Sequence, residues 1–362
     1  MSQSKPSATV EDMLTADVAA YGDPGGPQLG SQWTPLPLER FSDAKLRRAM
    51  DRFGYSGRIY ADVKTGEVII ANRGTQNRAN FKSDVGVAMG MVADAQSTAD
   101  EFARRGLIAA QRFLSDHGVK MSAIYTTGHS LGGAEAEGQA QMLSIENGPH
   151  ALPPDVHITN FSIDAPGVGY RAHRGDRSRY TSYNLSAQGD VVHKAGGDQL
   201  EGTVQVSLPI GPGIMQTEGK MIAGAAIAVE LPSVGVPILA DGAKQALDAH
   251  RSTLILNQVS GTALASTKVT ELGTSAGDIL AAFKTKSNQA QPTSVQAQSN
   301  ADAATEKHAA AIGVDHRDIW GLDTKGNIDP AALNGCTKQD YTERWLDLNG
   351  FESKPRMQHK NG

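Results

Sequence analysis

The chain has 362 residues, of which 39% are apolar and 20% charged, and its formal net charge at pH 7 is −5. That length suits one large α/β domain with an appendage, or two ordinary domains. The mildly acidic balance gives no reason to expect nucleic acid as a partner, and it does not attract anionic membrane by charge. The single cysteine, Cys336, excludes an intrachain disulfide, and its polar surroundings make it a poor nucleophile or metal ligand. We expect neither a cofactor nor a metal.

The first part of the chain predicts two helices and a β-hairpin. Apolar residues recur at helical spacing over Val10–Tyr21 and Ser42–Phe53, and the hairpin strands are expected at Gly57–Val63 and Glu67–Asn72. Met1–Thr15 has no apolar stretch like that of a signal peptide. We therefore expect a cytoplasmic protein, or one that is exported without a cleaved signal.

Strands then alternate with helices, which is typical of an α/β fold with a mostly parallel sheet flanked by helices. We expect helices at Ala93–Leu114 and Ser130–Ile145. We expect strands at Ala123–Thr127, His157–Ile163 and Tyr180–Leu185. After residue 270 the composition changes, and Ser287–Lys307 predicts a linker or a solvated helix. The expected domains are a helical segment that packs on the core (1–55), the α/β core with an apolar insertion (56–270, insertion 208–240), and a polar C-terminal linker with a small helical extension (271–362).

The most informative motif is Gly128-His129-Ser130-Leu131-Gly132-Gly133, which lies between a predicted strand and a predicted helix. In a G-x-S-x-G turn the serine adopts strained dihedral angles that push its Oγ out of the sheet, and the flanking glycines leave room across the turn. The positive end of the following helix then points at the reacting centre. We expect Ser130 to be a nucleophile supported by Gly128, His129 and Gly132. An idle serine in a glycine-rich turn is the structural alternative.

A second element, Arg73-Gly74-Thr75, ends the return strand of the hairpin. Attack on an ester leaves negative charge on the former carbonyl oxygen, and that charge requires preorganised N–H donors. We expect the backbone N–H of Leu131 to supply one donor and that of Thr75 another, with the Thr75 hydroxyl as a third. Taken alone, this segment would be no more than a polar strand end with a glycine turn.

Together, Arg73-Gly74-Thr75 and the Gly128–Gly133 motif resemble the class 3 lipases, a family of fungal triacylglycerol lipases with plant and bacterial phospholipase relatives. Two further landmarks follow in the family's order. Phe81-Lys82-Ser83-Asp84 stands in the place of a W-x-x-D pattern, and Phe161–Gly169 resembles an F-G-x-P-x-x-G strand end. The resemblance covers about Gly57–Leu256 and implies an α/β-hydrolase fold, with Asp84 in a supporting role.

The chain also departs from the family's pattern. Glu135 and Glu137 stand where small or apolar residues are usual, Phe81 replaces a Trp, and Asn72 takes the place of an aromatic residue. These departures touch no expected catalytic residue. They indicate a divergent branch in which the helix after the serine packs differently.

The resemblance implies a triad whose acid and base follow the serine along the chain. The segment Tyr183–Val192 resembles the family's strand that ends in an Asp, which makes Asp190 the expected acid. Asp164, one strand earlier, and Asp198, in a glycine-rich loop, are its competitors. The acid would hold the tautomer of the base and stabilise the imidazolium.

The expected base is His250, because Leu247–Ser252 resembles the family's late His followed by a small polar residue. His193 lies three residues after Asp190, where that acid could hardly orient it and still let it reach Ser130. The remaining downstream candidates, His308, His316 and His359, lie beyond the low-complexity stretch.

Between acid and base lies the apolar stretch Leu208–Ala240, whose Glu230, Pro232 and Pro237 argue against a membrane span. It predicts either a buried helix and strand over the sheet or a lid over Ser130 that accepts acyl chains. We therefore expect a serine hydrolase of lipid esters, a phospholipase A or a triacylglycerol lipase, that contacts membrane surfaces transiently.

The polar tail and the lack of a predicted signal peptide also resemble bacterial phospholipase effectors, which secretion machines inject into rival or host cells. That resemblance implies a partner in the secretion machinery or an inhibitor protein. Two other classes stay open. One is a non-enzymatic hydrolase-like scaffold whose tail recruits a partner, and the other is an esterase, thioesterase or peptidase with a non-lipid substrate.

Overall fold

A computed structural model describes residues 7–22, 26–74, 81–147, 151–188, 190, 192–194, 197–210 and 252–285. For residues 81–94, 170, 194 and 252 the description covers the backbone alone. Within these residues no helix is long and apolar enough to cross a membrane.

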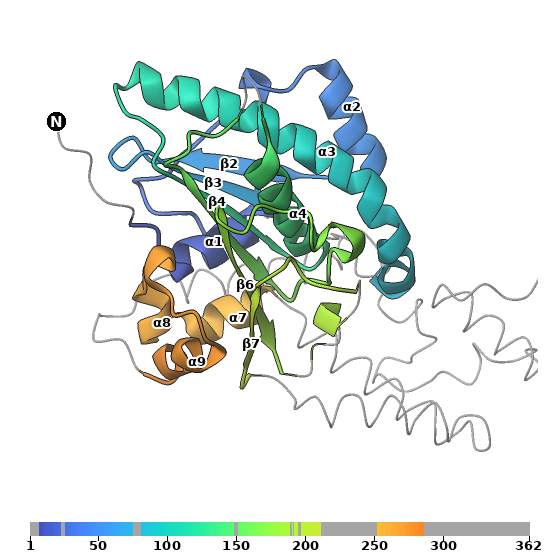
Figure 1. The fold of residues 1–362 in the computed structure, drawn as a ribbon, viewed down its shortest axis with the longest axis vertical. Helices are drawn as coiled ribbons and strands as arrows, with labels where there is room; N and C mark the ends of the chain where they lie inside the picture. The colour runs from blue at the N-terminus through green and yellow to red at the C-terminus, as the bar shows by residue number, and fades with distance from the viewer. Residues whose placement is uncertain are drawn as a thin grey trace, which may run out of the picture.

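A mixed sheet forms the centre of the described chain, with seven strands in the order β1-β2-β3-β4-β5-β6-β7 (Figure 1). Antiparallel pairing joins β1 to β2 and β2 to β3, and parallel pairing joins β3 through to β7. The strands are β1 (Thr34–Pro35), β2 (Gly57–Ala61), β3 (Glu67–Asn72), β4 (Ala123–His129), β5 (His157–Ile163), β6 (Tyr180–Ala187) and β7 (Val204–Leu208). Because β3 to β7 run in one direction, their carboxyl ends meet along one edge, where open α/β sheets place their sites.

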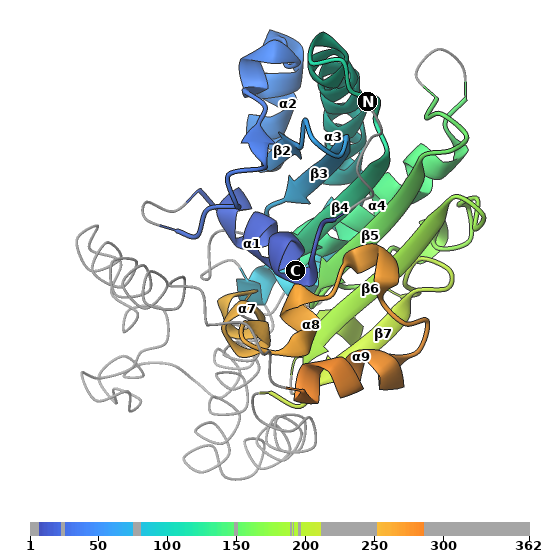
Figure 2. The same cartoon turned by 90° about the vertical axis from the view of Figure 1, so that its left-hand side faces the viewer.

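Helices cover both faces of this sheet (Figures 1 and 2). One face carries α2 (Ala44–Phe53), α3 (Phe81–Asp116) and α4 (Leu131–Ile145). The other carries α1 (Val10–Ala20), α7 (Ser252–Val259), α8 (Ala263–Ser266) and α9 (Ala276–Lys284). Short 3₁₀ turns lie at η1 (Leu38–Arg40), η2 (Gly169–Arg171), η3 (Val192–Lys194) and η4 (Val269–Glu271). The expected α/β class, a mostly parallel sheet flanked by helices, is confirmed.

The sheet separates two apolar cores, and β3 shows why its sequence is apolar throughout. Ile69 and Ala71 belong to the core beneath α1, whereas Val68 and Ile70 belong to the core beneath α3. Successive side chains of a strand point to opposite faces, so a strand that is covered on both sides needs apolar residues at every position.

Local capping sets where the first two helices begin. At the start of α1 the Thr9 hydroxyl accepts a hydrogen bond from Asp12 N, and the Asp12 carboxylate accepts one from Thr9 N. Asp43 caps α2 in the same way through Leu46 N, and Gly54 ends that helix in the left-handed conformation.

The N-terminal segment and the helices after residue 252 are joined on one face. Thr9 bridges to Lys268, and the Val10 N–H donates to the Thr267 carbonyl oxygen. Ile279 of α9 is buried in the same core as β6 and β7. The folded unit therefore continues past the boundary expected at residue 270. Most of the expected insertion 208–240, and everything after residue 285, lies outside the described residues.

The unusual polar residues at Asn72, Glu135 and Glu137 are all buried. Asn72 forms a reciprocal amide pair with Gln139, its Nδ2 donating over 2.8 Å and its Oδ1 accepting over 3.0 Å. The Tyr55 hydroxyl also donates to Asn72 Oδ1. This pair holds the carboxyl end of β3 against α4.

Glu137 accepts hydrogen bonds from Ser162 Oγ at 3.0 Å and from Leu200 N at 2.9 Å. Burial raises the pKa of Glu137 to about 8, and the two hydrogen bonds offset part of that rise. The Glu137 carboxyl is therefore protonated in the folded protein at neutral pH. Burial also raises the pKa of Glu135, and the nearby Arg73 lowers it in part. Burial thus disfavours the charged form of both acids on the helix after the serine.

Glu137→Gln removes a pH-dependent loss of stability. The unfolded carboxyl ionises near its ordinary value of 4.5 and the folded one only at about 8, so raising the pH between these values favours unfolding. A glutamine amide can accept from Leu200 and donate to Ser162. We expect the variant to gain stability over the wild type from pH 5 to pH 8, at about 1.4 kcal/mol per pH unit at most.

Urea unfolding at several pH values measures this difference, with the exposed Glu39→Gln as the control for loss of a charge. A difference between wild type and Glu137→Gln that stays constant with pH would show that Glu137 is ionised in the fold.

Candidate active site

Ser130 lies in a sharp turn between β4 and α4. Its backbone has φ 58° and ψ −129°, which L-residues with side chains rarely adopt. The Ser130 N–H donates to the Ile163 carbonyl oxygen at 2.9 Å, and the Ser130 carbonyl accepts from Gly133 and Ala134 at 2.9 and 3.2 Å. This is the strand–serine–helix geometry of a nucleophile elbow. The serine is 7% exposed.

The glycines of the motif allow backbone to approach backbone. A Cβ at Gly128 would lie 2.3 Å from the Gly132 carbonyl oxygen, and one at Gly132 would lie 2.4 Å from the Asn72 carbonyl oxygen. Both distances are far below a normal contact. The elbow therefore packs directly on the carboxyl end of β3, which brings the end of the hairpin beside the serine.

The chain that leaves β3 passes against Ser130. A Cβ at Gly74 would lie 2.4 Å from the His129 carbonyl oxygen and 3.3 Å from Ser130 Cβ. Thr75 follows directly but lies outside the described residues, as does the Asp84 side chain on α3. The Leu131 N–H begins α4, where the first N–H groups have no acceptor inside the helix and the helix dipole is positive.

Asp190 follows β6 and is fully buried. Its Oδ1 accepts from Val192 N at 3.0 Å, and its Oδ2 accepts from His193 N at 3.1 Å. The same Oδ2 lies 3.1 Å from His193 Nδ1, so the carboxylate orients this imidazole. The sequence disfavours a His193 that is both oriented by Asp190 and able to reach Ser130, and the structure shows the first of these two contacts. His250 lies outside the described residues.

The two competing aspartates lie in different surroundings. Asp198 is exposed and its carboxylate lies 3.5 Å from His173 Nε2, at the surface. Asp164 directly follows β5, is fully buried and has φ 47°. Burial raises the pKa of Asp164 most, and the neighbouring carboxylate of Asp190 adds to that rise. In the sequence, Asp164 and Asp190 are alternatives for the acid of the triad. In the structure the two side chains are neighbours.

The end of α1 covers the elbow from the other side of the sheet. The Tyr21 hydroxyl lies 2.9 Å from His129 Nδ1, and His129 Nε2 lies 4.0 Å from Asp164 Oδ2. Asp17 of α1 is also fully buried, and burial raises its pKa while the His129 backbone N–H lowers it in part. Asp17 and Tyr21 did not enter the sequence argument. An aspartate among the apolar residues of the first helix was the available signal.

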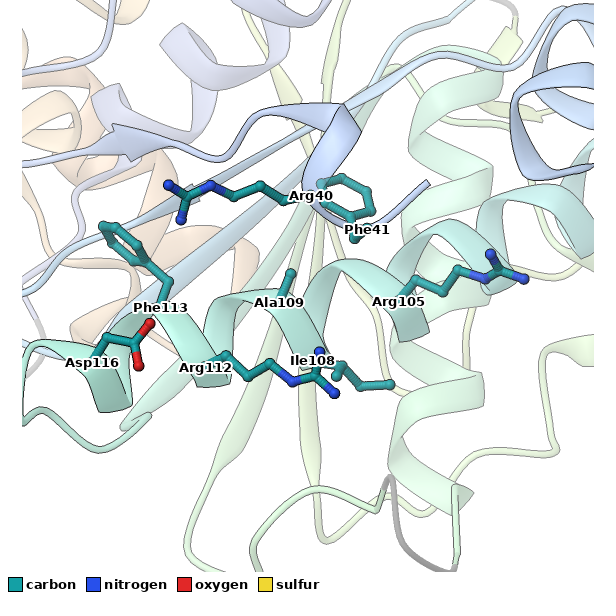
Figure 3. A pocket seen from close by; sticks show the side chains of 8 residues that line it. All are labelled: Arg40, Phe41, Arg105, Ile108, Ala109, Arg112, Phe113 and Asp116. Atoms are coloured by element: carbon teal, nitrogen blue, oxygen red, sulfur yellow. The ribbon is translucent and has the colours of Figure 1, made fainter. Parts of the chain in front are cut away.

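A separate cavity of about 430 Å³ lies over the C-terminal half of α3 (Figure 3). Its lining is basic and aromatic, formed by Arg40, Phe41, Arg105, Ile108, Ala109, Arg112, Phe113 and Asp116. Because α3 ends shortly before β4 begins, this cavity lies toward the amino end of the strand whose carboxyl end carries Ser130. It is not part of the site at the elbow. In the described part of the chain, no group of three or more acidic, His or Cys side chains is arranged to hold a metal.

No protein-family model and no curated protein matches the chain. Among solved structures it is similar to the Lip2 lipase from Yarrowia lipolytica, with 15% identity and a TM-score of 0.38 over 57% of this chain and 85% of that one. It is also similar to a triacylglycerol lipase from Penicillium expansum, with 15% identity and a TM-score of 0.40 over 55% of this chain and 78% of that one. A third similar structure is that of the M37 lipase, with 16% identity and a TM-score of 0.34 over 52% of this chain and 70% of that one.

Proposed function

We propose that the protein is a serine ester hydrolase of lipids, a phospholipase A or a triacylglycerol lipase, with Ser130 as its nucleophile. The observation that carries the proposal is the strained Ser130 turn at the carboxyl edge of a parallel sheet. Backbone strain of this kind persists only where the surrounding structure enforces it, and it clusters at active sites. The buried carboxylate of Asp190, already paired with an imidazole, supports the same chemistry.

In this mechanism a histidine removes the proton of Ser130 Oγ as the oxygen attacks the ester carbonyl carbon. The carbonyl oxygen becomes an oxyanion, which accepts hydrogen bonds from the Leu131 N–H and the Thr75 N–H. The imidazolium then protonates the leaving alcohol, and an acyl-enzyme remains. The same histidine then removes a proton from a water molecule, which attacks the acyl-enzyme. This second attack releases the fatty acid and restores the serine hydroxyl. Asp190 fixes the tautomer of the base and stabilises its charged form.

We take His250 as the base, on the resemblance of Leu247–Ser252 to the late histidine of the class 3 lipases. One observation favours a second candidate, because His193 Nδ1 is already in contact with Asp190 Oδ2, which leaves His193 Nε2 for the serine. The two assignments make opposite predictions for paired variants.

The substrate class follows from two features. The apolar stretch 208–240, between the proposed acid and base, suits an acyl chain better than a charged metabolite. The resemblance to the class 3 lipases points to glycerolipids, handled at a membrane surface. The likeness to bacterial phospholipase effectors extends the proposal to a protein delivered into rival or host cells and neutralised in its producer by an inhibitor. If a producer strain without the gene harms rival and host cells as well as its parent does, the proposed delivery into other cells is wrong.

Ser130→Ala abolishes release of fatty acid. We expect purified wild-type protein to release fatty acid from mixed phospholipid and triacylglycerol vesicles, and the variant to be slower by at least about 10³-fold, because no oxygen remains to form the acyl-enzyme. Ser115→Ala, at an exposed position of α3, is the matched control and keeps full activity.

The products of this assay separate the substrate classes. Hydrolysis of a short-chain ester without release of fatty acid would leave an esterase and remove the lipid assignment. If the wild type cleaves neither substrate, the protein is a hydrolase-like scaffold.

His250→Asn and His193→Asn distinguish the two bases. We expect His250→Asn to lower kcat by at least about 10³-fold with little change in KM, because the serine loses its proton acceptor. His193→Asn should cost less than about tenfold, since its Nδ2 amide can still donate to Asp190. Steady-state kinetics on a soluble ester measures both, with the exposed His117→Asn as the control. The opposite ranking would make His193 the base.

A further inference from the structure

Asp164 and Asp190 follow two neighbouring strands, and both form a hydrogen bond with Ala187. β5 and β6 pair in parallel, and Asp164 directly follows β5. Asp164 Oδ1 accepts from Ala187 N at 3.0 Å, and Asp190 N donates to the Ala187 carbonyl oxygen at 3.2 Å. Both carboxyl groups are fully buried, and their side chains lie within hydrogen-bonding reach of each other. Ala187 thus holds two acids side by side in an environment that disfavours charge.

The two carboxyl groups receive very different numbers of hydrogen-bond donors. Asp190 accepts from Val192 N, His193 N and His193 Nδ1. Asp164 accepts from Ala187 N through Oδ1, whereas its buried Oδ2 has no hydrogen-bond donor among the described residues. Two carboxylates in contact in a poorly solvated site do not both ionise, so the pair keeps one proton. The proton belongs on the oxygen that lacks a donor, which is Asp164 Oδ2.

Among the residues that the structure describes, charged and titratable groups approach the pair from α1, β4 and η3. Asp17 approaches from α1 and disfavours a negative charge on Asp164. His129 Nε2, at the end of β4, lies 4.0 Å from Asp164 Oδ2, which is too long for a hydrogen bond. His193 of η3 contacts the far partner, Asp190. The second buried acid nearby, and the lack of a donor to Oδ2 among the described residues, both favour the neutral form of Asp164.

We propose that Asp164 is a positioning residue for the hydrolase: its protonated carboxyl donates a hydrogen bond to Asp190 and holds that residue as an oriented anion. This rests on the proposed function, in which Asp190 must stay ionised to stabilise the imidazolium. The proton stays on Asp164 throughout the catalytic cycle, so the pair carries one negative charge in every state. Burial raises the pKa of Asp164, in agreement with this assignment.

Asp164→Asn tests the proposal, because an amide keeps both hydrogen bonds without a titrating proton. Its Oδ1 can accept from Ala187 N and its Nδ2 can donate to Asp190, and asparagine tolerates the positive φ of this position. We expect kcat on a soluble ester to stay within about threefold of the wild type, with the same pH profile. Asp164→Ala removes the donor and should lower kcat at least about tenfold, with KM unchanged.

A stability measurement reads the proton without reference to activity. The folded pKa of Asp164 lies above the unfolded value, so the wild type loses stability as the pH rises through that interval. The urea midpoint of Asp164→Asn should therefore rise relative to the wild type as the pH increases. Glu137→Gln is the matched control, because it also replaces a buried acid by its neutral amide. We expect its urea midpoint to rise with pH in the same way, while its kcat and the pH profile of kcat stay unchanged.

The outcomes separate the two proposals. If the midpoint of Asp164→Asn shows no gain with pH, Asp164 is ionised and the inference is overturned, whatever the activity. Equal losses of kcat in Asp164→Asn and Asp164→Ala, with both variants folded, would also overturn it, because the donated hydrogen bond would then not matter. If the midpoint gain is present but the wild type hydrolyses no ester, the shared proton stands and the hydrolase proposal fails.

Discussion

The backbone at Ser130 is the constraint on which the rest of the site depends. A residue with a side chain is held at positive φ where β4 turns into α4, and only close packing on every side keeps it there. That packing requires glycine at positions 128 and 132, since a Cβ there would run into backbone atoms. It also requires the end of β3 to lie against the elbow, which the Asn72–Gln139 amide pair secures. Strain at one residue thus accounts for sequence choices on three separate elements.

Acidic residues gather around this turn at a cost in stability. Asp17, Glu135, Glu137 and Asp164 are buried, and burial raises the pKa of each. Such residues lower stability at neutral pH relative to apolar ones of similar volume. Perturbed acids are common where a protein does chemistry, and the carboxyl edge of a parallel sheet is where such sites form. Asp190 is also buried there, it accepts from Val192 N, His193 N and His193 Nδ1, and it is the acid whose charge the proposed mechanism uses.

The features that the sequence predicts depend on residues close together in the chain, and the features that it misses depend on residues far apart in the chain or on the geometry of a turn. The five central strands and the elbow were predictable, because apolar runs and a glycine-flanked serine report on contacts within a few residues. β7 was missed, since its side chains alternate between buried and exposed over five residues only. The pairing of Asp164 with Asp190 was missed because it depends on which strand ends become neighbours. The contact between Asp190 and His193 depends on the tight turn of η3. Asp17 meets His129 across more than a hundred residues of sequence, and no local pattern predicts that.

The central claim is that Ser130 is an activated nucleophile, and covalent labelling tests it most directly. A fluorophosphonate has an electrophilic phosphorus that reacts with a serine oxygen whose proton a neighbouring base removes. Mass spectrometry of the digested wild-type protein should find one phosphonylated serine, Ser130, and His250→Asn should label far more slowly. A wild-type protein that stays unlabelled at Ser130, or that labels at another serine instead, would contradict the account.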